Sequence, residues 1–200
     1  MKLILPALCA IGLTTMIVIS CTDSANKTTV NSTDSTGASA MKGDTTASRG
    51  EYLVRIMGCH DCHTPLKMTP QGPAPDMDHM LSGAQAGTQL APYDTTTTKG
   101  WVLMSMTMNS FVGPWGTSFA ANITSDATGI GNWTFDNFRK ALVEGKSKGM
   151  DGARTLLPPM PWQNFQHIDE ADLKAIFNYL KSTKPISNIV PNPIPPGGHM

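Results

Sequence analysis

The sequence lacks an excess of either charge. It holds 15 lysine and arginine residues against 15 aspartate and glutamate residues, so its formal net charge is zero. Proteins that bind nucleic acid usually carry a basic excess, so this balance argues against a nucleic-acid partner. With 200 residues and two ends of low complexity, the chain has the length for one domain with one hydrophobic core.

Cysteine is also scarce, and the four cysteines are not distributed as in a disulfide-stabilised fold. Cys9 and Cys21 lie within and at the end of an apolar leader, whereas Cys59 and Cys62 form a close pair. A disulfide framework needs paired cysteines spread through the chain. The pair at positions 59 and 62 therefore points to other chemistry.

A long apolar run that could span a bilayer is missing as well. In residues 1–20 a short apolar stretch follows Lys2, which favours a cleaved signal peptide over a spanning helix. The sequence Val18-Ile19-Ser20-Cys21 resembles the lipobox of bacterial lipoproteins, in which the peptide is cut before the cysteine. This resemblance implies that Cys21 carries lipid and anchors an exported, periplasm-facing protein to a membrane. The alternative is an ordinary signal peptide with an incidental cysteine.

Residues 22–47 contain almost nothing that a folded core could bury. They are mainly Thr, Ser, Asn, Asp, Gly and Lys, so burial cannot offset the entropy of ordering them. We therefore expect four parts in chain order: a signal peptide at 1–20, a lipidated flexible tether at 21–47, a folded domain at 48–187, and a proline-rich, extended or disordered tail at 188–200.

Cys59-His60-Asp61-Cys62-His63 is the motif that carries the chemistry. C-x-x-C-H is the pattern of c-type heme attachment, in which the two thiols add to the vinyl groups of one heme and His63 faces the iron. His60 is expected to face solvent. A thioredoxin-like dithiol would be accompanied by a βαβ pattern, and a zinc site needs about four ligands; the sequence predicts neither.

A heme held in this way needs a second iron ligand, and Met and His are the usual choices. Met160 is the best candidate, because Leu157-Pro158-Pro159-Met160-Pro161-Trp162 predicts an extended loop that presents its side chain. The alternatives that the sequence leaves open are Met80, His79 and His167.

Three segments are predicted to be amphipathic helices. The first, at 49–58, follows a capping box that begins at Ser48 and leads into the cysteine motif. The second, at 135–144, follows a Thr134 cap, and the last begins behind Asp169. The residues expected on their buried faces are Leu53, Ile56, Met57, Phe138, Ala141, Leu142, Leu173, Ile176, Phe177 and Leu180.

A first helix that leads into C-x-x-C-H, a Met-Pro loop and an amphipathic last helix follow one another as in cytochrome c. Residues 48–187 resemble that family, in which the first and last helices cross and clamp the heme. Segments 122–134 and 157–162 are similar to those of cytochrome c subunits that serve bacterial membrane dehydrogenases. The resemblance implies a mostly α-helical cytochrome c fold around one covalently bound heme. Several of those subunits carry three heme motifs, whereas this chain has one.

The span between the two candidate iron ligands is longer than a minimal cytochrome c needs. Residues 77–131 are predicted to be an insertion of loops and a short strand. Alternation places Met104, Met106 and Met108 on one side, and such a methionine stripe is typical of core packing. Gly113-Pro114 predicts a turn. The insertion either covers a heme edge or forms a docking face, and the sequence leaves both open.

Covalent heme with two protein ligands favours electron transfer, because no iron position stays open for a substrate. We expect a carrier that passes electrons between a membrane or periplasmic dehydrogenase and a respiratory acceptor. Its partners would be redox proteins: a dehydrogenase, an oxidase or another cytochrome. Two alternatives, a heme peroxidase or oxidase and a heme-based gas sensor, both require a sixth ligand that can leave the iron.

Overall fold

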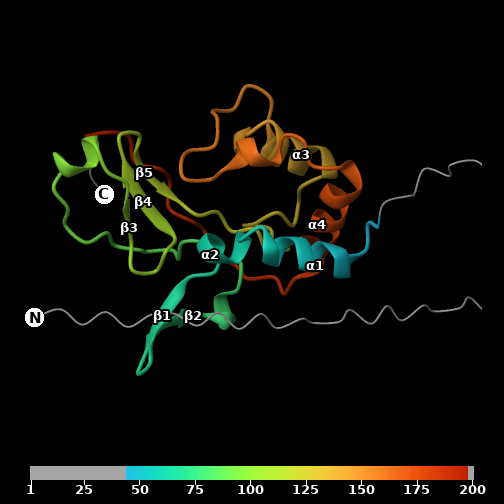
Figure 1. The fold of residues 1–200 in the computed structure, drawn as a ribbon, viewed down its shortest axis with the longest axis horizontal. Helices are drawn as coiled ribbons and strands as arrows, with labels where there is room; N and C mark the ends of the chain where they lie inside the picture. Colours follow the sequence, from blue (N-terminus) through green and yellow to red (C-terminus); the bar gives the residue numbers. More distant parts are fainter. Residues whose placement is uncertain (1–43, 198–200) are drawn as a thin grey trace, which may run out of the picture. The chain divides into compact units, whose positions relative to one another are not determined.

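A computed structural model describes residues 44–197 of the chain. The predicted signal peptide, Cys21 and most of the predicted tether lie outside the described residues. Within that range no helix combines the length and the apolar character needed to cross a membrane. The α-helices in this range are α1 Ala47–Ile56, α2 Cys59–His63, α3 Phe135–Val143 and α4 Glu170–Ser182 (Figure 1).

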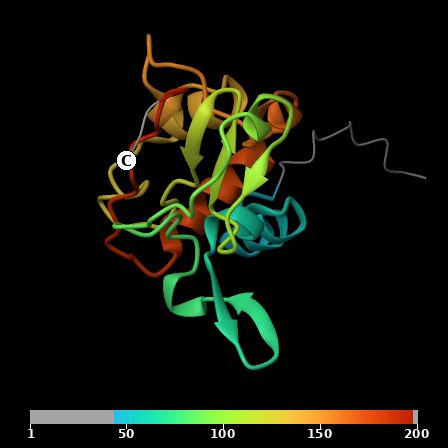
Figure 2. The ribbon, with the colours of Figure 1, turned by 90° about the vertical axis from the view of Figure 1, so that its left-hand side faces the viewer.

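Two small antiparallel sheets accompany the helices. β1 Leu66–Thr69 and β2 Gly72–Pro75 form a hairpin, which projects from the rest of the domain in both ribbon views (Figures 1 and 2). β3 Leu103–Met104, β4 Ser110–Gly113 and β5 Gly116–Phe119 form the second sheet in that order. The short 3-10 helices are Met77–His79, Thr97–Lys99, Ser147–Gly149 and Trp162–Phe165.

The expected predominance of helix needs correction. Between α2 and α3 the described chain holds only loops, short strands and 3-10 turns. The physical reason is the local sequence: this stretch has no sustained 3.6-residue apolar period and is rich in Gly, Pro and Thr. The described α-helices instead lie before residue 64 and after residue 134, and α1, α3 and α4 supply most of the hydrophobic core.

The core lies where α1 crosses α4. Gly50 is buried at the crossing, and a Cβ atom there would stand 1.9 Å from the carbonyl oxygen of Ala175, so the two backbones are in direct contact. Arg49 of α1 donates from Nε and Nη2 to the two carboxylate oxygens of Asp172 in α4, at 2.9 and 3.0 Å. The buried core residues are Leu53, Val54, Leu81, Ile130, Phe138, Leu173, Ala175, Ile176 and Leu180.

Helix α1 begins earlier than predicted. Thr46 is the cap, because its Oγ1 accepts from the Arg49 N–H at 3.2 Å, and Ser48 lies inside the helix. The buried face contains Gly50, Leu53 and Val54, with Met57 partly buried beside them. Ile56 falls off this i, i+3, i+4, i+7 stripe and is 60% exposed, so its assignment to the core was wrong.

The two later helices agree more closely with the prediction. Thr134 caps α3 in a reciprocal capping box with Asn137. Asp169 precedes α4 as expected, although its side chain makes no capping hydrogen bond. Phe177 is partly buried, and its ring centroid lies 5.3 Å from that of Phe138. This contact joins α4 to α3.

The structure corrects the prediction for the methionine stripe. Met104 and Met106 are 53% and 74% exposed, so they do not pack in the core. The predicted strand is short because the chain turns back after Met104, with the Met108 N–H donating to the Ser105 carbonyl at 2.9 Å. The predicted turn at Gly113-Pro114 is confirmed, since it joins β4 to β5.

The part of the tail that the structure describes packs on the domain. Ile194 and Thr117 of β5 exchange two backbone hydrogen bonds, at 2.8 and 3.0 Å. Asn188 is buried, and its Nδ2 donates to the carbonyls of Ser82 and Ala84 at 2.7 and 2.9 Å. The boundary expected after Ser187 therefore does not separate a free tail from the domain in this range.

Candidate heme site

The cysteine motif forms a single helical turn directly after α1. Gly58 separates the two helices with φ of 70°, a left-handed conformation in which a side chain would be strained. α2 then runs from Cys59 to His63. Residues three apart lie on the same face of a helix, so the fold presents Cys59 and Cys62 side by side, as attachment to the two vinyl groups of one heme requires.

The His63 imidazole is held in a defined orientation. Its Nδ1 lies 2.7 Å from the carbonyl oxygen of Ala121, which can only accept, so Nδ1 carries the proton and Nε2 keeps its lone pair. Desolvation lowers the pKa of His63, the direction that favours the neutral ring. A neutral imidazole with one nitrogen bonded to a carbonyl and the other basic is the usual state of an iron or zinc ligand.

The chain on either side of Ala121 is anchored to other parts of the fold. Gly83 donates its N–H to the His63 carbonyl at 2.8 Å, and a Cβ on Gly83 would stand 2.3 Å from the Ala120 carbonyl. The buried Asn122 accepts from the Thr124 N–H at 3.0 Å and donates to the Ile186 carbonyl at 2.8 Å. Sequence reasoning missed the roles of Gly83, Ala121 and Asn122; the only signal was the similarity noted for segment 122–134.

The two cysteines are free thiols in an apolar setting. Burial raises the pKa of Cys59 to about 11 and also raises the pKa of Cys62. Dithiols that work by thiol–disulfide exchange have a lowered pKa, so this pair does not fit a thioredoxin-like function. Within residues 44–197 no group of three or more His, Cys, Asp or Glu side chains is placed to hold a metal ion.

These features fit a covalently attached heme. Cys59 and Cys62 stand one helical turn apart, and the Nδ1 bond of the adjacent His63 to the Ala121 carbonyl leaves Nε2 as the nitrogen that would bind iron. The residues that would hold the group are Cys59, Cys62 and His63, and this assignment stays a prediction.

Met160 lies in a tight loop between α3 and the 3-10 helix at 162–165. Its N–H donates to the Leu157 carbonyl at 3.3 Å, and the Trp162 N–H donates to the Met160 carbonyl at 2.9 Å. The side chain is partly buried. The expected proline-held loop is present, and the assignment of Met160 as the ligand opposite His63 stays a prediction.

The alternative ligands lie in different settings. His79 Nδ1 is 2.7 Å from Asp76 Oδ2, and Met80 packs against the hydrophobic core. His167 is exposed. The segment that holds His79 and Met80 is tied beside the motif, because the Leu81 N–H donates to Thr64 Oγ1 at 3.0 Å.

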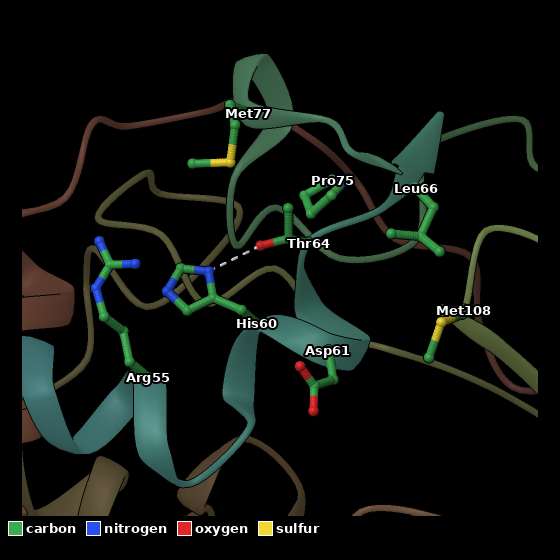
Figure 3. Close-up of a pocket in the computed structure, with 8 residues that line it drawn as sticks. All are labelled: Arg55, His60, Asp61, Thr64, Leu66, Pro75, Met77 and Met108. Carbon is green, nitrogen blue, oxygen red and sulfur yellow. Dashed lines mark hydrogen bonds between the residues drawn. The ribbon is translucent and has the colours of Figure 1, made fainter. Parts of the chain in front are cut away.

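His60 is not the solvent-facing residue that the sequence predicts. Its Nδ1 is 3.1 Å from Thr64 Oγ1, and its Nε2 is buried without a hydrogen-bond partner among the described residues. The ring lines a cavity of about 240 Å³ together with Arg55, Met77 and other side chains (Figure 3). Thr64 Oγ1 also accepts from the Leu81 N–H, so one hydroxyl contacts both the His60 ring and the segment that holds Met80. Burial lowers the pKa of His60.

The chain is similar to cytochrome subunits of bacterial dehydrogenases. It is 30% identical over 137 residues to the gluconate 2-dehydrogenase cytochrome c subunit of Pantoea cypripedii, covering 68% of this chain and 23% of that protein. It is 32% identical over 141 residues to the cytochrome c subunit of alcohol dehydrogenase (quinone) of Gluconobacter oxydans, covering 70% and 22%.

A third relative matches over a longer segment. The fructose dehydrogenase cytochrome subunit of Gluconobacter japonicus is 30% identical over 156 residues, which cover 77% of this chain and 24% of that protein. The chain thus spans less than a quarter of the length of these relatives. No family model matches the sequence. The similarity to three named cytochrome subunits agrees with the resemblance that the motif and the order of helices indicate.

Proposed function

We propose that this chain is a c-type cytochrome that transfers electrons and is not itself an enzyme. Cys59 and Cys62 attach a single heme, and His63 and Met160 bind its iron. The observation that carries the proposal is the His63 imidazole, held at Nδ1 by the Ala121 carbonyl beside two free thiols. The similarity to cytochrome c subunits supports it independently.

Heme supplies an iron that changes between the ferrous and ferric states. The task of the chain is to keep the surroundings of that iron unchanged while it does so. Thioethers at Cys59 and Cys62 prevent loss of the group, and the Ala121 carbonyl stops the His63 ring from rotating. A Met160 thioether favours ferrous iron and raises the reduction potential.

We infer that a dehydrogenase is the electron donor and that a respiratory protein is the acceptor. The relatives are named as subunits of gluconate, alcohol and fructose dehydrogenases, which supports a partner of that class. An oxidase or another cytochrome would serve as the acceptor. Because the formal net charge is zero, long-range attraction of the whole molecule contributes little, and tethering beside the partner would raise the effective concentration instead.

We also propose that the protein is exported and bound to a membrane through lipid on Cys21. The lipobox-like Val18–Cys21 sequence supports this, and such an anchor needs no spanning helix. Mass spectrometry of protein purified from membranes should find a mature chain that begins with diacylated Cys21. A mature chain that begins elsewhere and is soluble without detergent would disprove the anchor.

Spectroscopy distinguishes a carrier from a heme enzyme or a gas sensor. A carrier with two protein ligands should be low-spin in both oxidation states, and its ferrous form should not bind carbon monoxide. A peroxidase, an oxidase or a sensor needs a sixth position that opens. A high-spin ferrous spectrum, or rapid carbon monoxide binding at micromolar concentrations of the gas, would contradict the assignment as an electron carrier.

A further inference from the structure

One hydrogen bond joins the predicted insertion to the loop that carries Met160. Ser118 lies in β5, is buried, and donates from Oγ to the Pro158 carbonyl at 2.5 Å. Pro158 stands two residues before Met160, and the two bonded residues are 40 positions apart in the chain. The contact therefore brings a part of the insertion against the loop of the candidate ligand.

The loop has an unusual need for such a donor. Three of the five residues from Leu157 to Pro161 are prolines, which have no N–H to donate. The Met160 N–H bonds within the loop, to Leu157. Among the described residues, the Ser118 hydroxyl makes the only hydrogen bond between residues 157–161 and another part of the fold that is distant in sequence.

The Ser118 hydroxyl is held in position by its own sheet. The indole Nε1 of Trp115, in the turn between β4 and β5, donates to Ser118 Oγ at 3.2 Å. The Trp115 ring covers Gly113, where a Cβ atom would stand 2.4 Å from the ring. The Ser118 hydroxyl thus accepts a hydrogen bond from the indole, and the hydroxyl's own hydrogen points to the Pro158 carbonyl. β5 is in turn paired with Ile194, so the support rests on two segments.

We propose that Ser118 is a positioning residue that holds the Met160 loop and so keeps the methionine thioether available to the iron. The inference rests on the proposed function and deepens it. The sequence left open whether the insertion covers a heme edge or forms a docking face. The inference gives its β4–β5 hairpin a third role, the support of the Met160 loop. Ser118 does not touch the iron; it acts through the Pro158 carbonyl.

Ser118→Ala should loosen the loop and expose the iron while the heme stays attached. With imidazole as the probe, the affinity of the ferric protein should rise about five- to tenfold, the change expected when one buried hydrogen bond is lost. On heating, the sulfur-to-iron absorption band of the oxidised variant should weaken at a lower temperature than that of the unmodified protein. Ser118→Thr keeps the hydroxyl and should restore both properties.

Ser182→Ala is the matched control. The Ser182 hydroxyl also donates to a carbonyl, that of Tyr179 at 2.7 Å, but it is exposed at the end of α4. This variant should bind imidazole like the unmodified protein. If Ser118→Ala does not fold, Trp115→Phe removes the indole N–H donor to Ser118 together with part of the ring, and it should raise imidazole affinity in the same direction.

A double variant separates the inference from the proposed ligand. With Met160 already replaced by alanine, adding Ser118→Ala should not change imidazole affinity further. If Met160→Ala opens the iron but Ser118→Ala and Trp115→Phe both behave like the unmodified protein, the positioning role is wrong and the ligand assignment stands. If Met160→Ala has no effect on imidazole affinity, both the ligand assignment and the inference are wrong.

Discussion

Replacing Met160 with alanine should abolish the weak sulfur-to-iron absorption band near the red end of the visible spectrum of the oxidised protein. The reduction potential should fall or the iron should open to added ligands, because a thioether favours ferrous iron and its loss removes that preference. The heme should stay attached, since Cys59 and Cys62 are unchanged. Absorption spectra and a potentiometric titration of the purified protein measure these effects.

Two further variants identify the ligand if Met160 is not the one. Met160→His should keep a low-spin iron at a lower potential, and Met80→Ala should leave the band intact. If Met80→Ala removes the band while Met160→Ala does not, the ligand lies in the insertion. If neither variant matters, His79 or His167 becomes the candidate, and the partner would be a donor of lower potential.

The second large effect is expected at the crossing of α1 and α4. Gly50→Ala would place a Cβ atom 1.9 Å from the Ala175 carbonyl oxygen, a distance that forces the two helices apart. Overpacking of a core typically costs about 1–3 kcal/mol, and a clash of a Cβ atom with the backbone of the facing helix should reach or exceed the upper end. The gain in helix propensity from Gly to Ala, roughly 0.5–1 kcal/mol, is smaller.

Urea unfolding of the purified heme protein measures this loss of stability. Gly100→Ala is the control, because nothing lies within 4 Å of its Cβ position and its φ is −124°. The control should change the free energy of unfolding by no more than about 0.5 kcal/mol. A Gly50→Ala variant as stable as this control would show that the helices do not touch at Gly50.

The features that the sequence predicted well are those encoded within a few residues. α3 and α4 follow from a short apolar period and the Thr134 and Asp169 positions. The heme assignment of the C-x-x-C-H motif rests on its spacing alone and stays a prediction. The prediction that Ile56 is buried was wrong because periodicity alone does not say which of two adjacent apolar stripes meets the partner helix. The predicted cap was Ser48, but the helix begins after Thr46. Either side chain can cap a helix, so the local sequence does not decide between the two starts.

The features that the sequence could not predict depend on contacts between distant segments. The Ala121 carbonyl bonds His63 across 58 residues, and no local pattern marks a backbone carbonyl as an orienting group. Ser118 reaches Pro158 across 40 residues in the same way. The exposure of Met104 and Met106 depends on where the loop turns back, which a strand period does not encode.

The most direct test of the proposed function is acid–acetone extraction of the denatured protein purified from an expression host that can attach heme c. We predict that the heme stays with the polypeptide, because thioether bonds to Cys59 and Cys62 survive unfolding, and that a variant in which both cysteines are alanine loses it. Heme that leaves the unmodified chain in this treatment, or a purified chain that carries no heme, would contradict the assignment as a c-type cytochrome.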